Sequence, residues 1–238
     1  MKIKNTKTKY DIIRVASESF FEKGYSVTAL KMIARELKIS PGNVTYYFPT
    51  KEHALLIIVE MLLDYQWRIF TKEIDNGMDT LSAACLEFVT IAASCQQNPV
   101  VKDLFIAICE SEMCRVYVRN HRIERSRRII KELGSNWNEE QSALAEIMIR
   151  GIFYSIITTD DSVVPLETRI VGALRLIFSI YNVDEESGNR IIANILQTDY
   201  RKLGKRVMDG FANYVKVTNE KTMEEIMGQC KRGSNQFG

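Results

Sequence analysis

The side chains best suited to chemistry gather in one short stretch, Ser40 to Tyr47, which reads SPGNVTYY. The stretch combines hydroxyls, one amide and two adjacent phenol rings with a glycine that leaves the backbone accessible. Hydroxyl and amide groups can bond phosphate oxygens and base edges, and tyrosine rings can pack on sugars or thymine methyl groups. No acidic residue interrupts the stretch. These residue types point to contact with a nucleic acid.

Residues for other kinds of chemistry are scarce in this sequence. The two histidines, His53 and His121, have no metal-ligand spacing with cysteines or carboxylates, and there is no G-x-S-x-G and no phosphate-binding glycine loop. The five cysteines, an odd number without a C-x-x-C pair, predict neither a disulfide framework nor a zinc site. We therefore predict that the protein is not an enzyme and has no catalytic residues, metal site or cofactor.

Charge is distributed unevenly along the 238 residues. Residues 1–52 hold ten Lys/Arg and five Asp/Glu, which gives +5, while the remainder holds 22 and 25, which gives −3. A basic N-terminal unit indicates an anionic partner, and the alternative is a solvated basic tail. The N-terminus lacks the apolar core of a signal peptide, and the longest uncharged run is too short and polar to span a bilayer. We expect no membrane association and a cytoplasmic protein with reduced thiols.

The elements that must position the Ser40–Tyr47 stretch are helices, because nearly every long segment has helical apolar spacing. Thr28, Ser40 and Thr50 are predicted N-caps, and Pro41 suits a first helical position, where no N–H is needed. No strand alternation of useful length and no internal repeat is present, so we predict an all-α fold. Helices are predicted over residues 8–23, 28–37, 40–48, 51–73, 80–96, 100–117, 119–133, 138–158, 165–182, 185–216 and 220–230.

Two short helices separated by Lys38-Ile39-Ser40 form a helix-turn-helix, in which the second helix enters the major groove with its N-terminal end first. Val44 and Phe48 are the positions expected to face the core. The remaining positions of this second helix are then free for contacts outside the chain.

This block resembles the tetracycline-repressor (TetR) family of bacterial regulators. The resemblance runs in order and without gaps through residues 10–56, and it does not extend beyond about residue 60. Two positions depart from the family pattern: Lys38 stands where the turn usually has Gly, and Thr45 where the family usually has Tyr. The matching positions are Ile12, Ala16, Phe20, Gly24-Tyr25, Thr28, Ile33-Ala34, Ile39-Ser40-Pro41-Gly42, Tyr47-Phe48, Lys51-Glu52 and Leu55-Leu56.

The resemblance implies a DNA-binding role for particular residues. Thr28 and Lys51 would bind phosphate at two helix N-termini, where backbone N–H groups also favour anions. The groove positions would be Ser40, Pro41, Gly42, Asn43, Thr45, Tyr46 and Tyr47. The partner would be double-stranded DNA carrying a palindromic operator, and the protein would be bacterial and nucleoid-associated.

In this family the larger body dimerises and often holds a small-molecule pocket. An apolar seam of two helices is consistent with a homodimer, and the alternative is that both helices are buried within one chain. The predicted interface residues are Leu144, Ile147, Met148, Gly151, Leu166, Ile170, Ala173 and Ile177.

Aromatic residues and methionine suit an adaptable pocket for a hydrophobic ligand, although ordinary core packing is the alternative for each of them. The candidates are Trp67, Phe70, Phe88, Phe105, Cys109, Met113 and Tyr117. An arginine-rich segment, residues 115–131, is interpreted either as a solvated face or as a site for an anion such as an acyl thioester or phosphate.

Together these features predict two domains, a three-helix helix-turn-helix domain at 1–50 and a helical regulatory and dimerisation domain at 51–238. The second domain would include extra C-terminal helices over 184–230. The predicted function is a dimeric, sequence-specific transcriptional regulator, a repressor that a small hydrophobic ligand releases. The alternative is an architectural or adaptor DNA-binding protein without a small-molecule inducer.

Overall fold

The computed structural model describes residues 3–225, and helices are the only regular secondary structure in that range. The all-α prediction is confirmed. Within the described range, no helix combines the length and apolar character needed to cross a membrane. The helices are α1 (Ile3–Glu22), α2 (Leu30–Glu36), α3 (Pro41–Tyr47), α4 (Lys51–Asp75), α5 (Thr80–Gln97), α6 (Pro99–Glu110), α7 (Glu112–Glu132), α8 (Glu139–Thr158), α9 (Leu166–Tyr181), α10 (Glu185–Gln197) and α11 (Tyr200–Val217).

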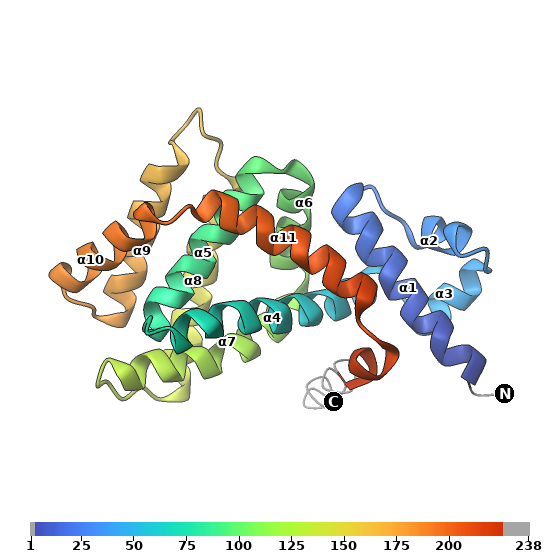
Figure 1. Ribbon diagram of the computed structural model, residues 1–238, viewed down its shortest axis with the longest axis horizontal. Helices are drawn as coiled ribbons and strands as arrows, with labels where there is room; N and C mark the ends of the chain where they lie inside the picture. Colours follow the sequence, from blue (N-terminus) through green and yellow to red (C-terminus); the bar gives the residue numbers. More distant parts are fainter. Residues whose placement is uncertain (1–2, 226–238) are drawn as a thin grey trace.

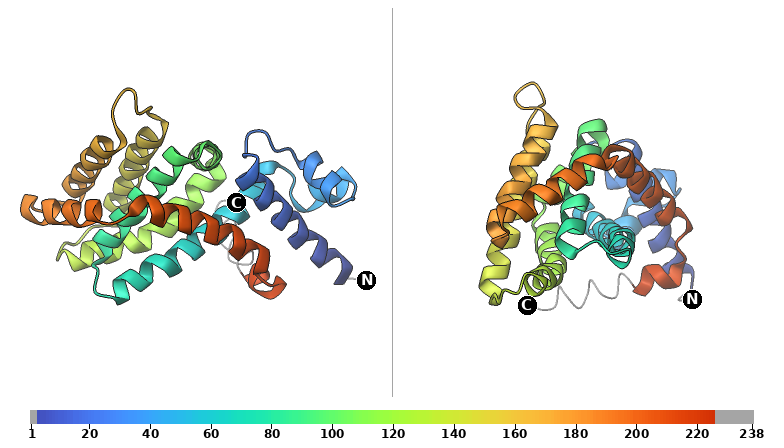
Figure 2. Two further views of the ribbon diagram at one scale, coloured as in Figure 1. Left: turned by 45° about the horizontal axis from the view of Figure 1, so that its top comes forward. Right: turned by 60° about the vertical axis from the view of Figure 1, so that its left-hand side comes forward.

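Helices α1 to α3 occupy one end of the molecule, and α9 and α10 lie at the opposite end (Figure 1). Helix α4 leads from the small unit into the body, where it packs against α5 and α7. Helix α8 packs between α7 and α9, and α6 contacts both α1 and α8. The body is thus a bundle in which α4, α6 and α11 also contact the N-terminal unit (Figure 2).

Local sequence explains the helix-turn-helix unit. The Ser40 hydroxyl accepts a hydrogen bond from the Asn43 N–H at 3.2 Å, and Pro41 takes the first helical position, as predicted. The turn before it is built by Lys38, whose φ of 55° is the left-handed conformation that glycine adopts more easily. A lysine therefore tolerates the turn geometry at this position. Val44 and Phe48 are buried and hold α3 against α1 and α2.

Several predicted boundaries were wrong. Helix α1 begins at Ile3, five residues before the prediction. The body helices predicted at 100–117 and 119–133 meet at Ser111, whose hydroxyl caps α7 by accepting from Cys114 N–H. The helix predicted at 185–216 divides at Thr198, and Asp199 caps α11. The two breaks are made by serine and aspartate N-caps and contain neither glycine nor proline. The helical spacing of apolar residues continues through both breaks, so this spacing did not reveal them.

The C-terminal helices brace the body and the N-terminal unit. Helix α11 runs along α5 and continues to α4 and α1 (Figure 1). A Cβ atom at Gly204 would lie 2.7 Å from the Thr90 carbonyl oxygen, so close packing of α11 on α5 requires glycine there. At the other end, Phe211 is fully buried and contacts the Phe21 ring of α1, with centroids 5.3 Å apart. A further helical segment covers 220–225, and predicted positions 226–230 lie outside the described residues.

Candidate nucleic-acid interface and internal cavity

Helix α3 exposes a continuous polar and aromatic face at the end of the molecule. Its most exposed large side chain is Tyr46, whose accessible fraction is 75%. The Tyr46 ring stands edge-on to Tyr47, with centroids 5.0 Å apart, so one phenol supports the other. The Thr45 hydroxyl donates to the carbonyls of Pro41 and Gly42 at 3.3 Å, which leaves its lone pairs for an outside donor. The exposed residues are Ser40, Pro41, Gly42, Asn43, Thr45 and Tyr46, while Tyr47 is half-buried.

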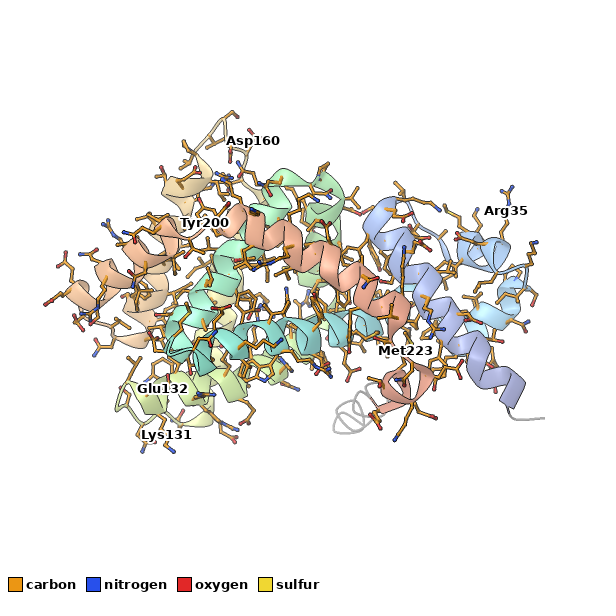
Figure 3. The ribbon with its side chains drawn as sticks, viewed as in Figure 1. Arg35, Lys131, Glu132, Asp160, Tyr200 and Met223 are labelled. Carbon is orange, nitrogen blue, oxygen red and sulfur yellow. The ribbon has the colours of Figure 1, made fainter. Side chains whose placement is uncertain are left out.

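Three cationic side chains near α3 were not among the site residues predicted from the sequence. Lys31 and Arg35 are exposed on α2, four residues apart and therefore on one side of that helix, and Lys38 is exposed in the turn. Arg35 extends outward at the far end of the unit (Figure 3). The sequence contained a signal for Lys31 and Arg35, because these basic residues are spaced four apart on the side of α2 opposite the buried pair Ile33 and Ala34.

The two predicted phosphate-binding side chains have other partners. Thr28 is buried, and its hydroxyl donates to the Gly24 carbonyl at 2.7 Å; the N-cap of α2 is Ala29, so the predicted cap at Thr28 was wrong. Lys51 Nζ donates to the Tyr25 carbonyl at 2.7 Å and lies 3.9 Å from the Tyr25 ring centroid. Burial lowers the pKa of Lys51, while the nearby Asp103 carboxylate opposes that shift. Both side chains therefore stabilise the N-terminal unit through hydrogen bonds to its own backbone carbonyls.

A second link ties the N-terminal unit to α6. The Asp103 carboxylate accepts from the Ser26 backbone N–H at 2.8 Å and from the Ser26 hydroxyl. Gly24, with φ of 107°, sits against the same carboxylate. The α1–α2 turn is thus fastened to α4 through Lys51 and to α6 through Asp103.

An apolar cavity lies between α4, α5, α6, α7 and α8. We call it the effector cavity. Its apolar wall includes Leu62 from α4, Phe105 and Ile108 from α6, Val118 from α7 and Phe153 from α8. Four polar residues, Gln66, Arg115, Arg122 and Arg150, also line it. The wall therefore includes α4 and α6, which also contact the N-terminal unit.

The predicted pocket residues divide between cavity wall and core. Phe105 and Cys109 line the effector cavity. Phe88 lines a neighbouring cavity, and its ring meets Phe153 edge-on at 5.4 Å between centroids. The other four candidates are not part of the wall, and Phe70 is a buried core residue, as the alternative interpretation had it. The four are Trp67, Phe70, Met113 and Tyr117.

The arginine-rich segment does not form a uniform solvated face. Arg125 and Arg122 turn inward and pair with buried Glu87, the latter at 3.6 Å. Burial would raise the pKa of Glu87, but the two guanidinium groups hold it below its ordinary value. Arg127 and Arg128 instead form exposed ion pairs with acidic side chains nearby.

The predicted interface residues fall into two groups. Leu144, Ile147, Met148 and Gly151 are exposed along one face of α8, together with Tyr154. The α9 residues were assigned wrongly, because all of them are buried against their own chain and cannot face a partner. These are Leu166, Ile170, Ala173 and Ile177. The exposed face of α9 instead presents Gly172, Leu176 and Ser179.

The fold and this geometry define a helix-turn-helix protein with a helical body. In the part of the chain that the structure describes, no group of three metal-ligating side chains comes together.

Comparison with known proteins agrees with this class. Residues 12–56 match the model of the family described as "Bacterial regulatory proteins, tetR family". This match covers the helix-turn-helix unit and the start of α4.

Two curated relatives share the N-terminal region. The chain is 30% identical over 77 residues to the HTH-type transcriptional regulator HbdR of Aromatoleum sp. (strain CIB), covering 32% of this chain and 34% of HbdR. It is 44% identical over 61 residues to the uncharacterized HTH-type transcriptional regulator YuxN of Bacillus subtilis (strain 168), covering 26% of this chain and 20% of YuxN. The matches thus span about a third and a fifth of these relatives.

Solved structures are similar at a more distant level. A gamma-butyrolactone receptor (ArpA-like protein) aligns with a TM-score of 0.44 and 18% identity, over 82% of this chain and 98% of the receptor. The TetR family protein CprB from S. coelicolor A3(2) aligns with a TM-score of 0.42 and 14% identity, over 89% and 99% of the two chains. The function proposed for the body therefore rests on the contacts of its own residues.

Proposed function

We propose that this protein is a dimeric, sequence-specific DNA-binding regulator of bacterial transcription, and that it is a repressor released by a small ligand. The exposed α3 face carries the proposal, because Asn43 and Tyr46 are exposed on a helix that is anchored by the buried residues Val44 and Phe48. Lys31, Arg35 and Lys38 add the positive charge that phosphates require. Residues 1–50 are proposed to form the DNA-binding domain, and residues 51–238 the domain that regulates DNA binding. The protein is proposed to act in the cytoplasm.

The contacts proposed for DNA differ in kind. Asn43 and Tyr46 would read base edges from the exposed face of α3, and Ser40, Gly42, Thr45 and Tyr47 would contact backbone or groove walls. Thr28 and Lys51 are proposed to act indirectly, by fixing the α1–α2 turn and the start of α4.

Dimerisation is proposed to use the exposed apolar face of α8 and α9. Leu144, Ile147 and Met148 recur at three and four residues, and Leu176 continues the surface on the neighbouring helix. Gly151 and Gly172 have nothing within 4 Å of their Cβ positions, so a second copy could approach closely there. Pairing two copies of this two-helix face would make a four-helix interface.

Release is proposed to run through α4 and α6, which line the effector cavity and also hold the α1–α2 turn. A ligand that displaces Leu62 or Phe105 would move Lys51 or Asp103 and with them the α3 helices of the dimer. Half-sites on DNA have a fixed spacing, so a change in the separation of the two α3 helices would cost affinity. The ligand can shift the equilibrium only by its differential affinity for the two shapes, about 1–3 kcal/mol in typical cases.

Genome-wide occupancy mapping tests the regulator against the architectural alternative. A few sites at promoters, each with two related half-sites, would support a regulator. Hundreds of dispersed sites without a shared sequence would favour the architectural protein.

A further inference from the structure

The effector cavity contains a buried amide that the fold leaves without a partner. Gln66 is only 1% exposed, and its Nε2 has no hydrogen-bond partner among the described residues. An unsatisfied buried donor is destabilising, whereas a leucine of similar size would fit the apolar wall at no such cost. Gln66 lies on α4 beside the apolar residues that line the cavity, about one helical turn after Leu63.

A second unsatisfied donor lies in the same wall. Arg122 Nε is buried and has no hydrogen-bond partner within the described part of the chain. The terminal nitrogen of the same guanidinium lies 3.6 Å from the Glu87 carboxylate, which Arg125 also contacts. Two guanidinium groups thus share one carboxylate, and Arg122 has both charge and an N–H available at the cavity.

Two further guanidinium groups reach the cavity. Across residues 3–225, neither Arg115 nor Arg150 forms an ion pair; Arg115 donates instead to the Glu110 carbonyl at 2.7 Å. The Glu110 carboxylate accepts from the Tyr154 hydroxyl at 3.0 Å. Burial raises the pKa of the Cys109 thiol in the wall, and Arg122, Arg150 and Arg115 each oppose that rise, which indicates that their charges surround one region of the cavity.

We propose that the effector cavity binds a small amphipathic carboxylate, with its apolar body against Phe105 and Phe153 and its carboxylate held by Gln66 and Arg122. This inference rests on the proposed function, for which it names the ligand class. A purely hydrophobic ligand would leave both buried donors unsatisfied. A carboxylate presents two coplanar oxygens that match the guanidinium fork, and Arg115 and Arg150 supply the compensating charge. The Gln66 amide then serves binding at the expense of the empty protein's stability.

The test uses octanoate and 1-octanol, which share an apolar chain and differ in the head group. Their affinities for the full-length protein are measured by calorimetry without DNA, for wild type and for Gln66→Leu and Arg122→Met. Arg127→Met is the matched control, because Arg127 lies on the same helix, is exposed and does not line the cavity. Thermal unfolding of each ligand-free variant is recorded in parallel.

We expect wild type to prefer octanoate over 1-octanol by about tenfold or more, the size of one charge-assisted hydrogen bond. Gln66→Leu and Arg122→Met should lose most of this preference, and Arg127→Met should keep it. Gln66→Leu should also raise the unfolding midpoint of the ligand-free protein. Should Arg122→Met fail to fold, Gln66→Leu alone decides the outcome.

Equal affinity for the two probes, a preference that survives both cavity substitutions, or no octanoate binding would each overturn the inference. DNA affinity of wild type, measured separately by fluorescence anisotropy, distinguishes this failure from a failure of the proposed function. Sequence-specific DNA binding without octanoate binding removes only the ligand class. Octanoate selectivity without specific DNA binding removes the regulator and leaves the cavity chemistry standing.

Discussion

Replacing Leu176 by aspartate is expected to separate the dimer without unfolding the protomer. Leu176 is 56% exposed in the single chain, so an aspartate there stays hydrated in the monomer. Full burial of a leucine side chain is worth about 1.5–3 kcal/mol, and the exposed half that a partner would cover is therefore worth roughly 1–1.5 kcal/mol. Two protomers lose this contact, which is roughly 2–3 kcal/mol per dimer and raises the dimer Kd about 30- to 150-fold. The cost of burying a carboxylate adds to this loss.

Ile170→Asp is the matched variant on the same helix, with the opposite expectation. Ile170 is 0% exposed. Removing its side chain costs about 2–5 kcal/mol, and an unpaired buried charge costs several more, which approaches a typical total stability of about 5–15 kcal/mol. This variant should unfold. Sedimentation velocity over a concentration series, with circular dichroism as the folding control, measures both. A folded Leu176→Asp protein that stays dimeric at wild-type concentrations would refute the proposed interface.

Three further outcomes are expected. Gly204→Ala should lower the unfolding free energy by about 1–3 kcal/mol in denaturant titration, because its Cβ would overpack against the α5 backbone at 2.7 Å; an unchanged midpoint would contradict the close approach of α11. The folded pKa of Glu87 lies below its ordinary 4.5, so the stability from its ion pairs is present above about pH 4.5 and is lost as pH falls through the folded pKa. Glu87→Gln should flatten this acid loss and cost about 3–5 kcal/mol at pH 7, since it strands two buried arginines; a steep acid transition in the variant would place the titrating group elsewhere. Lys31→Met should weaken binding to all DNA and reduce the salt slope by about 1, whereas Lys51→Met should mainly lower stability; a larger slope change for Lys51 would restore it as a phosphate contact.

The helix-turn-helix could be predicted because its determinants are local in sequence. Ser40 caps α3 through a neighbour three residues away, Pro41 sets the first turn, and Val44 and Phe48 anchor it. The predicted N-cap at Thr28 was wrong because a threonine before an apolar run has the sequence pattern of an N-cap. Its hydroxyl turns back to Gly24, a contact that depends on how α1 ends.

The interface and the cavity could not be predicted to the same extent, because they depend on distant packing. Helix α9 has apolar or small residues on two faces, and periodicity alone does not say whether Ile170 or Leu176 meets the body. Gln66 is one of several polar residues in α4, and its burial follows from α6, α7 and α8, which lie far along the chain. The inward turn of Arg122 likewise depends on Glu87 from another helix.

Selection of binding sites from a random pool of duplex DNA tests the central claim most directly. Wild-type protein should enrich one sequence with two related half-sites in inverted repeat, spaced by about one helical turn. Asn43→Ala and Tyr46→Ala, both at exposed positions, should fold normally, bind the selected site about 1–3 kcal/mol more weakly and bind random DNA nearly as before. Failure of the wild type to enrich any sequence, or equal losses of both variants on selected and random DNA, would contradict base reading by α3.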